Sequence, residues 1–104
     1  MSWLSTMFGG GAGATRISGA TARELVAAGA QLVDVRTPAE FGGGHIPGAK
    51  NIPVDQIAAR HGELDPKKPV VVYCRSGGRS ASAGSTLVGA GFTQVSDLGP
   101  MSAW

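Results

Sequence analysis

Short apolar runs alternate along the chain with segments that have helical spacing or helix start signals. The runs at 31–35 and 70–74 have the length and β-branched content of buried strands. Shorter strands are expected near 16–18, 51–52 and 94–98, and helices at 21–28, 37–41, 54–60 and from about 80 to 90. Alternating strands and helices predict an α/β fold, with a central parallel sheet of about four to five strands and helices on both faces.

The first helix has two candidate starting points. Thr21 and Glu24 have the spacing of a capping box, in which threonine is the N-cap and glutamate stands at N3. Ser18 is the alternative N-cap. The helix is expected to end near Ala28 and to turn Leu25 and Ala28 toward the core.

A clearer helix start follows the second strand. Thr37 is a suitable N-cap, Pro38 suits the first helical position and Glu40 completes a capping box. This helix is short because three glycines, 42–44, follow at once. Arg36 is close enough in sequence to Glu40 for the two side chains to pair across the turn.

The last helix is built largely from small residues, so tertiary packing must hold it. Ala83, Leu87 and Ala90 form one stripe that is expected to face the core. Gly91 and Phe92 predict a Schellman ending, in which the phenylalanine folds back onto Leu87.

The only cysteine stands between the strand at 70–74 and this helix. Gly77 and Gly78 would let the loop backbone fold closely over whatever the Cys74 sulfur holds. Free N–H groups at the helix N-terminus, together with Arg75 and Arg79, would favour an anion there and lower the pKa of the thiol. We therefore predict that Cys74 is a nucleophile and not merely a small buried residue.

Three blocks of residues carry a family resemblance. They are the Val-Val-Val-Tyr strand with Cys-Arg-Ser-Gly-Gly-Arg-Ser at 70–80; Leu-Val-Asp-Val-Arg at 32–36 with the matching positions 40–41, 44–49 and 51–53; and the ending at 98–104. Together they cover roughly residues 17–104 and resemble one module of the rhodanese (thiosulfate sulfurtransferase) family. The resemblance implies a rhodanese-like fold with the cysteine loop at the carboxyl edge of the sheet. Pro100 departs from the family, because it stands where a second glycine is usual.

The resemblance also implies roles for the residues around the catalytic cysteine, Cys74. Substrate binding would fall to the loop residues Arg75, Ser76, Gly77, Gly78, Arg79 and Ser80. A scaffold role near the site is expected for Asp34, Arg36, Glu40 and His45. His45 could instead be a general base, but it needs no catalytic role as a hydrogen-bonding residue.

Loop length separates two kinds of relatives. Cysteine phosphatases, and arsenate reductases with the longer loop, place an arginine six positions after the cysteine. Here Arg79 is the fifth residue after Cys74 and Ser80 is the sixth. This spacing favours sulfur transfer over a phosphatase or an arsenate reductase, which stay less favoured alternatives.

The leading hypothesis is a sulfurtransferase that works through a Cys74 persulfide. It would move a sulfane sulfur from a small anionic donor, thiosulfate or a persulfide, to cyanide or a thiol acceptor. No metal and no organic cofactor are expected. The alternative from another class is a non-enzymatic rhodanese-like module that docks onto a partner or senses oxidants through Cys74.

Composition argues against several other classes. One cysteine among 104 residues can form neither an internal disulfide nor a cysteine-based metal site, and two histidines alone are a poor ligand set. A formal net charge of +2 with scattered lysines gives no case for nucleic acid. No apolar run approaches the roughly 18 to 20 residues that a membrane span needs.

The chain divides into two parts by composition. Residues 1–15 contain a glycine-rich stretch and are expected to be a flexible N-terminal tail, while residues 16–104 form the rhodanese-like domain. The first residues lack the charged region and long apolar core of a signal peptide. We expect a cytoplasmic protein that is a monomer or a weak homodimer.

Overall fold

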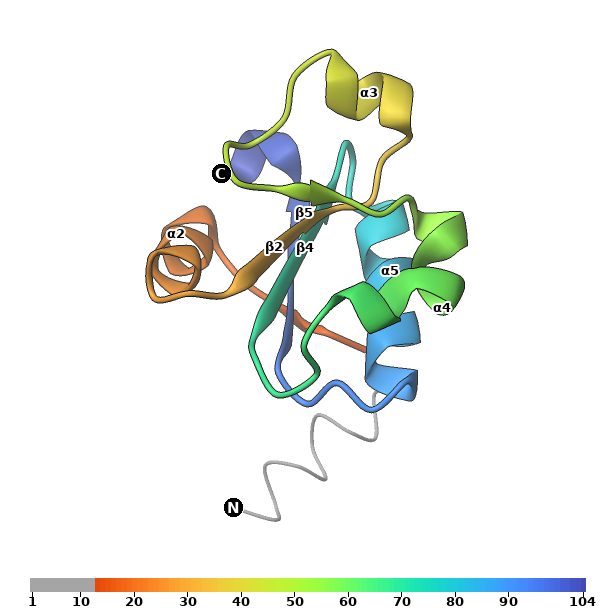
Figure 1. The fold of residues 1–104 in the computed structure, drawn as a ribbon. Helices are drawn as coiled ribbons and strands as arrows, with labels where there is room; N and C mark the ends of the chain where they lie inside the picture. Colours follow the sequence, from red (N-terminus) through yellow and green to blue (C-terminus); the bar gives the residue numbers. More distant parts are fainter. Residues whose placement is uncertain (1–12) are drawn as a thin grey trace.

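The structure is a computed structural model that describes residues 13–104. Five parallel strands form its centre (Figure 1). They are β1 (Thr15–Arg16), β2 (Gln31–Asp34), β3 (Lys50–Asn51), β4 (Val70–Cys74) and β5 (Val95–Pro100). Their order across the sheet is β1-β5-β4-β2-β3, and every neighbouring pair is parallel. Because β4 is central, all five of its residues are buried. The predicted parallel sheet is confirmed.

Helices cover both faces of this sheet, as predicted. They are α2 (Gly19–Ala27), α3 (Pro38–Gly42), α4 (Ile57–Arg60) and α5 (Gly78–Gly89), with short 3-10 turns η1 (Val54–Gln56), η2 (His61–Glu63) and η3 (Met101–Ala103). Figure 1 shows α2 on one face of the sheet and α4 and α5 on the other. The short α3 lies beyond the end of the sheet.

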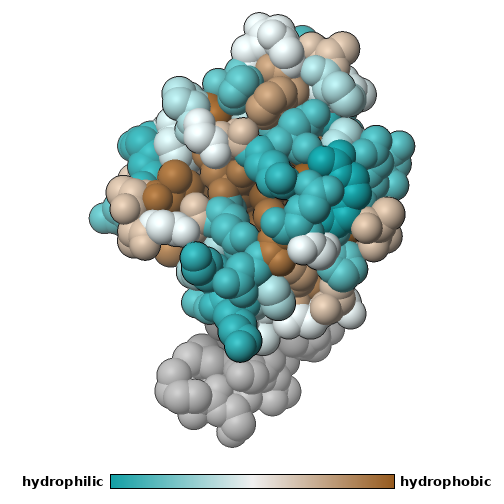
Figure 2. Space-filling view, viewed as in Figure 1, coloured by the Kyte–Doolittle hydropathy of each residue, from teal (hydrophilic) through white to brown (hydrophobic). Residues whose placement is uncertain are grey.

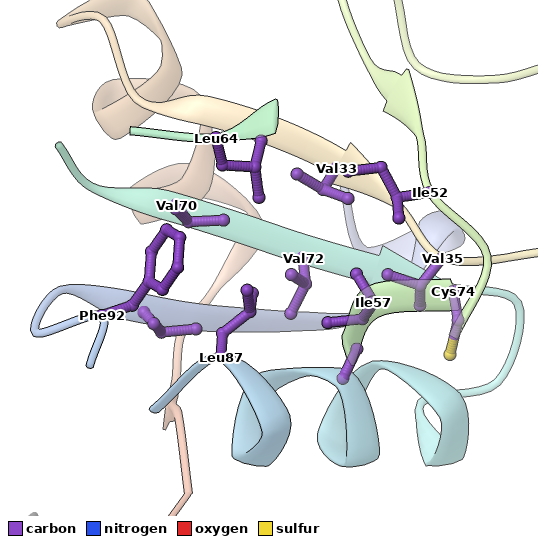
Figure 3. Close-up of a cluster of buried hydrophobic side chains, with 12 residues drawn as sticks. Val33, Val35, Ile52, Ile57, Leu64, Val70, Val72, Cys74, Leu87 and Phe92 are labelled. Atoms are coloured by element: carbon purple, nitrogen blue, oxygen red, sulfur yellow. The ribbon is translucent and has the colours of Figure 1, made fainter. Parts of the chain in front are cut away.

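Successive residues of β4 point to opposite faces, as the pleat of a strand requires. The core cluster on the α5 face comprises Val33, Val35, Ile52, Ile57, Leu64, Val70, Val72, Cys74, Ala83, Leu87, Phe92 and Val95 (Figure 3). The smaller cluster on the α2 face comprises Ala22, Leu32, Ile46, Val71, Tyr73 and Leu98. The cysteine therefore belongs to the α5 side of the sheet and the neighbouring tyrosine to the α2 side.

Helix α2 begins at the earlier of its two candidate positions. Ser18 is the N-cap, and its Oγ accepts a hydrogen bond from the Thr21 N–H at 3.2 Å. The capping box predicted for Thr21 is therefore wrong. Ala22 is the buried residue of the helix and Leu25 is partly buried. Ala28 is exposed, contrary to the prediction, because it is the C-cap and lies beyond the last helical residue.

The signals at the ends of α3 and α5 are confirmed. Thr37 caps α3 and forms the capping box with Glu40. At the end of α5, the Phe92 N–H donates to the Leu87 carbonyl at 3.1 Å, and both side chains are in the same core cluster. Ala90, predicted to face inward, is the exposed C-cap of α5.

The predicted helix at 54–60 and the predicted strand at 94–98 are among the elements whose bounds differ in the structure. The segment 54–60 is a 3-10 turn followed by a single α-helical turn, with Ile57 buried. Strand β5 reaches Pro100 and not only Leu98, and its pairing with β4 contains an irregularity. Tyr73 pairs with Gly99 and Cys74 with Pro100, one residue out of step with the preceding pairs. Such a bulge brings Gly99 and Pro100 beside the carboxyl end of β4.

The structure describes the end of the predicted tail but not its beginning. Residues 1–12, most of the predicted tail, lie outside the described residues, whereas Ala14 packs against the α5-face core and Thr15 starts β1. On the face seen in Figure 2, hydrophobic residues appear between hydrophilic ones near the middle. Within residues 13–104, no helix is both long and apolar enough to cross a membrane.

Candidate active site

Cys74 is the last residue of the central strand, and its side chain is buried. Figure 3 shows its sulfur at the end of β4, on the side of the sheet where α5 begins. The N–H of Gly77 donates a hydrogen bond to Sγ over 2.9 Å. The Ser80 Oγ lies 3.5 Å from the same sulfur. One short loop and the first turn of a helix thus surround the sulfur, as the sequence predicted.

Gly77 gives the loop its shape. Its φ of 108° is in the left-handed region, where a residue with a Cβ would be strained. It is also the N-cap of α5, and its carbonyl accepts a hydrogen bond from the Ser80 hydroxyl at 3.0 Å. The helix starts at Gly78, two residues earlier than predicted. This early start brings Ser80 into the first turn of the helix and next to the sulfur.

Burial raises the pKa of the Cys74 thiol, but hydrogen bonds lower it by more. The donors are the Ser80 hydroxyl and the backbone N–H groups of Ser80, Gly77 and Ser76. The net effect is a pKa below the ordinary thiol value, as predicted. The sequence predicts that the loop arginines help to lower this pKa. In the structure the groups that lower it are the Ser80 hydroxyl and backbone N–H groups.

The Ser80 hydroxyl has one proton and two possible acceptors. In the neutral state the Cys74 thiol donates to Ser80 Oγ, which in turn donates to the Gly77 carbonyl. A thiolate has no proton to donate, so the hydroxyl must turn toward Sγ to stabilise the anion. Ser80 is fully buried, so water does not compete for this hydrogen bond.

Arg79 is held by Glu40, which lies 39 positions earlier in the chain. Nη1 and Nη2 of Arg79 donate to the two carboxylate oxygens of Glu40 at 2.7 and 3.0 Å. Hydrogen bonding from Arg79, followed by that of the Thr37 backbone, lowers the pKa of Glu40 to about 2. Arg36 does not pair with Glu40, although the two are close enough in sequence to do so, because α3 presents Glu40 to the first turn of α5.

Arg36 instead forms a buried ion pair with Asp34, two residues before it. Its Nη2 is 2.7 Å from Asp34 Oδ2, and its Nε also donates to the carboxylate. The same Nη2 donates to the Gly44 carbonyl at 2.7 Å. Hydrogen bonds from the Asn51 side chain to the carbonyls of Asp34 and Arg36 extend this arrangement to β3. We call Asp34, Arg36, Gly44 and Asn51 the brace.

Tyr73 connects the brace to the cysteine strand. Arg36 Cζ lies 5.8 Å from the centre of the tyrosine ring, and the phenol oxygen accepts a hydrogen bond from the Ile46 N–H at 3.1 Å. Burial, followed by the hydrogen bond with Asp34, raises the pKa of Tyr73 to about 12. Neither Tyr73 nor Asn51 is predicted from the sequence to have a role at the site, although a tyrosine next to the cysteine in an apolar strand was a usable signal.

Two of the predicted site residues, His45 and Arg75, make no hydrogen bond to the sulfur within residues 13–104. His45 is exposed, stacks on Phe41 with ring centres 3.7 Å apart, and has Nδ1 3.0 Å from the Phe41 carbonyl. Among residues 13–104 it makes no hydrogen bond to the cysteine loop. Arg75 is exposed and makes no salt bridge within the same range. The structure thus brings Arg79 to Glu40 and leaves Arg75 open to solvent.

In the described part of the chain, no group of three or more His, Cys, Asp and Glu side chains lies close enough together to bind a metal ion. The arrangement is that of a partly activated thiol in a loop of hydrogen-bond donors, at the carboxyl edge of a parallel sheet. Such a site can form a covalent bond to an electrophilic atom and stabilise the resulting anion.

Comparison with known proteins agrees with this description. The family model of the rhodanese-like domain matches residues 18–104. The chain therefore belongs to the rhodanese-like domain family, and its fold is the rhodanese-like fold.

Individual relatives cover much of the chain. It is 38% identical over 104 aligned residues to thiosulfate sulfurtransferase 16, chloroplastic, of Arabidopsis thaliana, covering 85% of this chain and 84% of that protein. It is 49% identical over 69 residues to the uncharacterised protein YqhL of Bacillus subtilis, covering 66% of this chain but only 55% of YqhL. The solved structure of the human single-domain sulfurtransferase TSTD1 superposes with a TM-score of 0.71 at 30% identity, covering 88% of this chain and 93% of TSTD1.

Proposed function

We propose that this protein is a sulfurtransferase that carries the transferred sulfur as a persulfide on Cys74. In the first step the Cys74 thiolate attacks the outer sulfur of thiosulfate. A new sulfur–sulfur bond forms on Cys74, the bond within thiosulfate breaks, and sulfite leaves with that electron pair. In the second step an acceptor, cyanide or a thiol, takes the outer sulfur and restores the thiolate. This is nucleophilic catalysis in two half-reactions.

The observation that carries the proposal is the contact of the Cys74 sulfur with the Gly77 N–H at 2.9 Å. A donor at this distance stabilises negative charge on the sulfur without rearrangement of the protein. The Ser80 hydroxyl adds a second donor once Cys74 has ionised. Membership of a family that includes proteins named as sulfurtransferases supports the same chemistry.

The two loop arginines have different parts in this proposal. Glu40 neutralises Arg79, so Arg79 fixes the first turn of α5 more than it attracts substrate. Arg75 is exposed and unpaired among residues 13–104, so it is the loop cation that draws in an anionic donor. The backbone N–H groups of the loop, Ser76 to Gly78, complete the binding site for the anion carried by the sulfur.

The test is the intact mass of the reduced protein before and after incubation with thiosulfate, with sulfite release followed in parallel. We expect a gain of one sulfur atom on Cys74, an equal amount of sulfite, and loss of the added mass on treatment with cyanide. The Cys74→Ser variant should fold normally and show neither the mass gain nor sulfite release. Sulfite release by this variant would contradict the mechanism.

The mass experiment and two further assays separate sulfur transfer from the docking or sensing module and from the phosphatase or arsenate reductase alternatives. No mass gain on an accessible, reduced Cys74 would favour a docking or oxidant-sensing module, and mild oxidation followed by mass analysis would then be informative. Hydrolysis of an aryl phosphate or reduction of arsenate would favour the phosphate-type relatives. The fifth-position Arg79, already paired with Glu40, makes a poor phosphate clamp and supports sulfur transfer.

Three further features stay with the proposal. The reaction needs no metal or organic cofactor, because the cysteine itself carries the sulfur. A cytoplasmic location and a monomer or weak homodimer remain predictions from the sequence. Cell fractionation and light scattering of the purified protein would test them.

A further inference from the structure

Asp97 of β5 is a buried acidic residue that the proposed mechanism does not use. Only 5% of its surface is exposed, and within residues 13–104 it forms no salt bridge, whereas the buried Asp34 is paired with Arg36. The carboxylate of Asp97 instead accepts a hydrogen bond from the Gly99 N–H at 2.8 Å. Burial of a carboxyl group without a cation is unfavourable, so this hydrogen bond identifies what the side chain does in the fold.

The hydrogen bond lies at the irregularity between β4 and β5, two strands that run side by side (Figure 1). The strands are in step up to the pair that Asp97 forms, and β5 then has one extra residue, Leu98. Beyond it, Pro100 pairs with Cys74. The φ of Gly99 is +81°, which glycine adopts readily and other residues rarely. By binding the Gly99 N–H two residues ahead, the side chain of Asp97 closes this bulge.

Two further residues hold the bulge. The side chain of Leu98 is fully buried in the core cluster on the α2 face of the sheet. Pro100 has a φ of −73°, a value that its ring enforces. The bulge is therefore fixed by a hydrogen bond at its start, a buried side chain in its middle and a proline at its end.

The bulge faces the loop that surrounds the Cys74 sulfur. A Cβ added to Gly77 would lie 3.9 Å from both Gly99 Cα and Pro100 Cδ, an ordinary van der Waals distance. The space between Gly77 and the bulge is thus no wider than a single carbon atom would fill. Gly77 is also the residue whose N–H donates to Sγ over 2.9 Å. Movement of the bulge would therefore change the room that Gly77 has and the distance of its N–H from the sulfur.

We propose that Asp97 is a positioning residue for the cysteine loop: by closing the β5 bulge, its carboxylate keeps the Gly77 N–H at the Cys74 sulfur. The inference rests on the proposed function of Cys74 as a nucleophile. The hydrogen bond of Asp97 is to Gly99 and not to the sulfur, so Asp97 acts through the bulge and then through Gly77. Without it the bulge can straighten or move along β4, and the anion on Cys74 loses a fixed donor.

The experiment compares variants that remove or keep the acceptor at position 97. Asp97→Ala removes it, and Asp97→Asn keeps a side-chain oxygen that can accept from Gly99. The control is Asp65→Ala, because Asp65 Oδ1 accepts a hydrogen bond from the Lys67 N–H two residues ahead, at an exposed position before the amino end of β4. The pH dependence of iodoacetamide alkylation gives the pKa of Cys74, and chemical denaturation gives the stability.

Asp97→Ala should raise the pKa of Cys74 by about one unit, which corresponds to loss of one hydrogen bond to the thiolate. Asp97→Asn should raise it much less, and Asp65→Ala should leave it unchanged. A merely structural role would lower the denaturation midpoint of Asp97→Ala without moving the alkylation profile of the folded protein. That result, or equal pKa shifts for Asp97→Ala and Asp97→Asn, would overturn the proposal.

Pro100→Gly keeps the test decisive if Asp97→Ala does not fold. It frees the backbone opposite Cys74 while leaving the Asp97 hydrogen bond in place, and Pro100 is not fully buried, so the variant should fold. The pKa of Cys74 should again rise, by less than with Asp97→Ala. An unchanged alkylation profile would overturn the proposal.

Sulfite release from thiosulfate is followed for the same proteins, so that two failures are distinguishable. If the unmodified protein releases no sulfite but Asp97→Ala shifts the alkylation profile, the proposed sulfur transfer fails and the role of Asp97 stands. If the unmodified protein releases sulfite and neither Asp97→Ala nor Pro100→Gly shifts the profile, sulfur transfer stands and the role of Asp97 is overturned.

Discussion

Two loops meet at the carboxyl edge of the sheet, and they are built in different ways. The loop after β4 surrounds the Cys74 sulfur with groups three and six positions away, the Gly77 N–H and the Ser80 hydroxyl. The connection after β2 contributes ion pairs and hydrogen bonds that reach other elements, as in the Arg36 carbonyl with Asn51 of β3 and Glu40 with Arg79 of α5. The first loop sets the chemistry of the sulfur, and the second holds the first in position.

This difference predicts that substitutions in the two loops affect different properties of the protein. Loss of a group in the loop after β4 should change the reactivity of Cys74 with little change in stability. Loss of a group in the brace should lower stability and leave the sulfur of the folded protein nearly unchanged. The following variants test that division in order of expected effect.

Asp34→Asn should have the largest effect, because it leaves the buried Arg36 guanidinium without its carboxylate. Removing one partner of a buried ion pair typically lowers the free energy of unfolding by about 3 kcal/mol or more. Both side chains are almost inaccessible to solvent, at 7% for Arg36 and 0% for Asp34, so water cannot replace the lost partner. Chemical denaturation followed by circular dichroism measures the change.

The control for this variant is Glu63→Gln, which breaks the exposed pairs of Glu63 with Arg60 and Lys50. Exposed pairs contribute little, so its denaturation midpoint should move much less. A loss for Asp34→Asn no larger than that of Glu63→Gln would mean that the brace does not stabilise the fold. A raised Cys74 pKa in the folded variant would mean that the two loops are not independent.

Local features of this structure could be predicted from the sequence, because their partners are a few residues apart. The capping box of Thr37 with Glu40, the ending of α5 at Phe92 and the cysteine loop all follow from short-range rules. The start of α2 shows the limit of such rules. Ser18 and Thr21 were both acceptable N-caps, and local propensity did not choose between them.

Long-range features could not be predicted in this way. The pairing of Glu40 with Arg79 depends on how α3 lies against α5, and a spacing of 39 residues contains no such information. The position of Gly99 and Pro100 beside the cysteine strand depends on strand order and on the irregularity in β5, which the sequence does not specify by itself. The family resemblance indicated which residues gather near Cys74 but not which of them form pairs.

Ser80→Ala should have an intermediate effect, and one confined to the reactivity of the sulfur. Burial raises the pKa of Cys74 and the hydrogen-bond donors lower it. Without the Ser80 hydroxyl fewer donors oppose burial, so the pKa of Cys74 should rise. A hydrogen bond to an anion is worth about 1.5 kcal/mol or more, which corresponds to a persulfide-forming rate lower by about tenfold or more at neutral pH. The pH dependence of iodoacetamide alkylation measures the pKa, and sulfite release measures the rate.

Ser82→Ala is the matched control, since Ser82 is an exposed serine on the same helix. Its alkylation profile should overlap that of the unmodified protein. If Ser80→Ala also left the profile unchanged, the backbone N–H groups alone would stabilise the thiolate, and the turning of the Ser80 hydroxyl would be excluded.

Glu40→Gln should have the smallest effect, and one that depends on pH. The glutamine keeps an oxygen for the α3 capping box but removes the charge that Arg79 binds. The pKa of Glu40 is about 2 in the folded protein against an ordinary value of 4.5, so its carboxylate stabilises the fold above about pH 4.5. That contribution is lost as the pH falls from about 4.5 toward 2, because the unfolded protein binds the proton first and is thereby stabilised relative to the folded protein.

The measurement is therefore the denaturation midpoint of the two proteins over a series of pH values. The unmodified protein should be the more stable one near neutral pH, and the difference should close toward pH 2. Glu24→Gln, at an exposed position on α2, should show no such convergence. A difference that stays constant into acid would mean that Glu40 acts through the capping box alone, and the long-range link between the two loops would then be the Arg36 network and not the Arg79 pair.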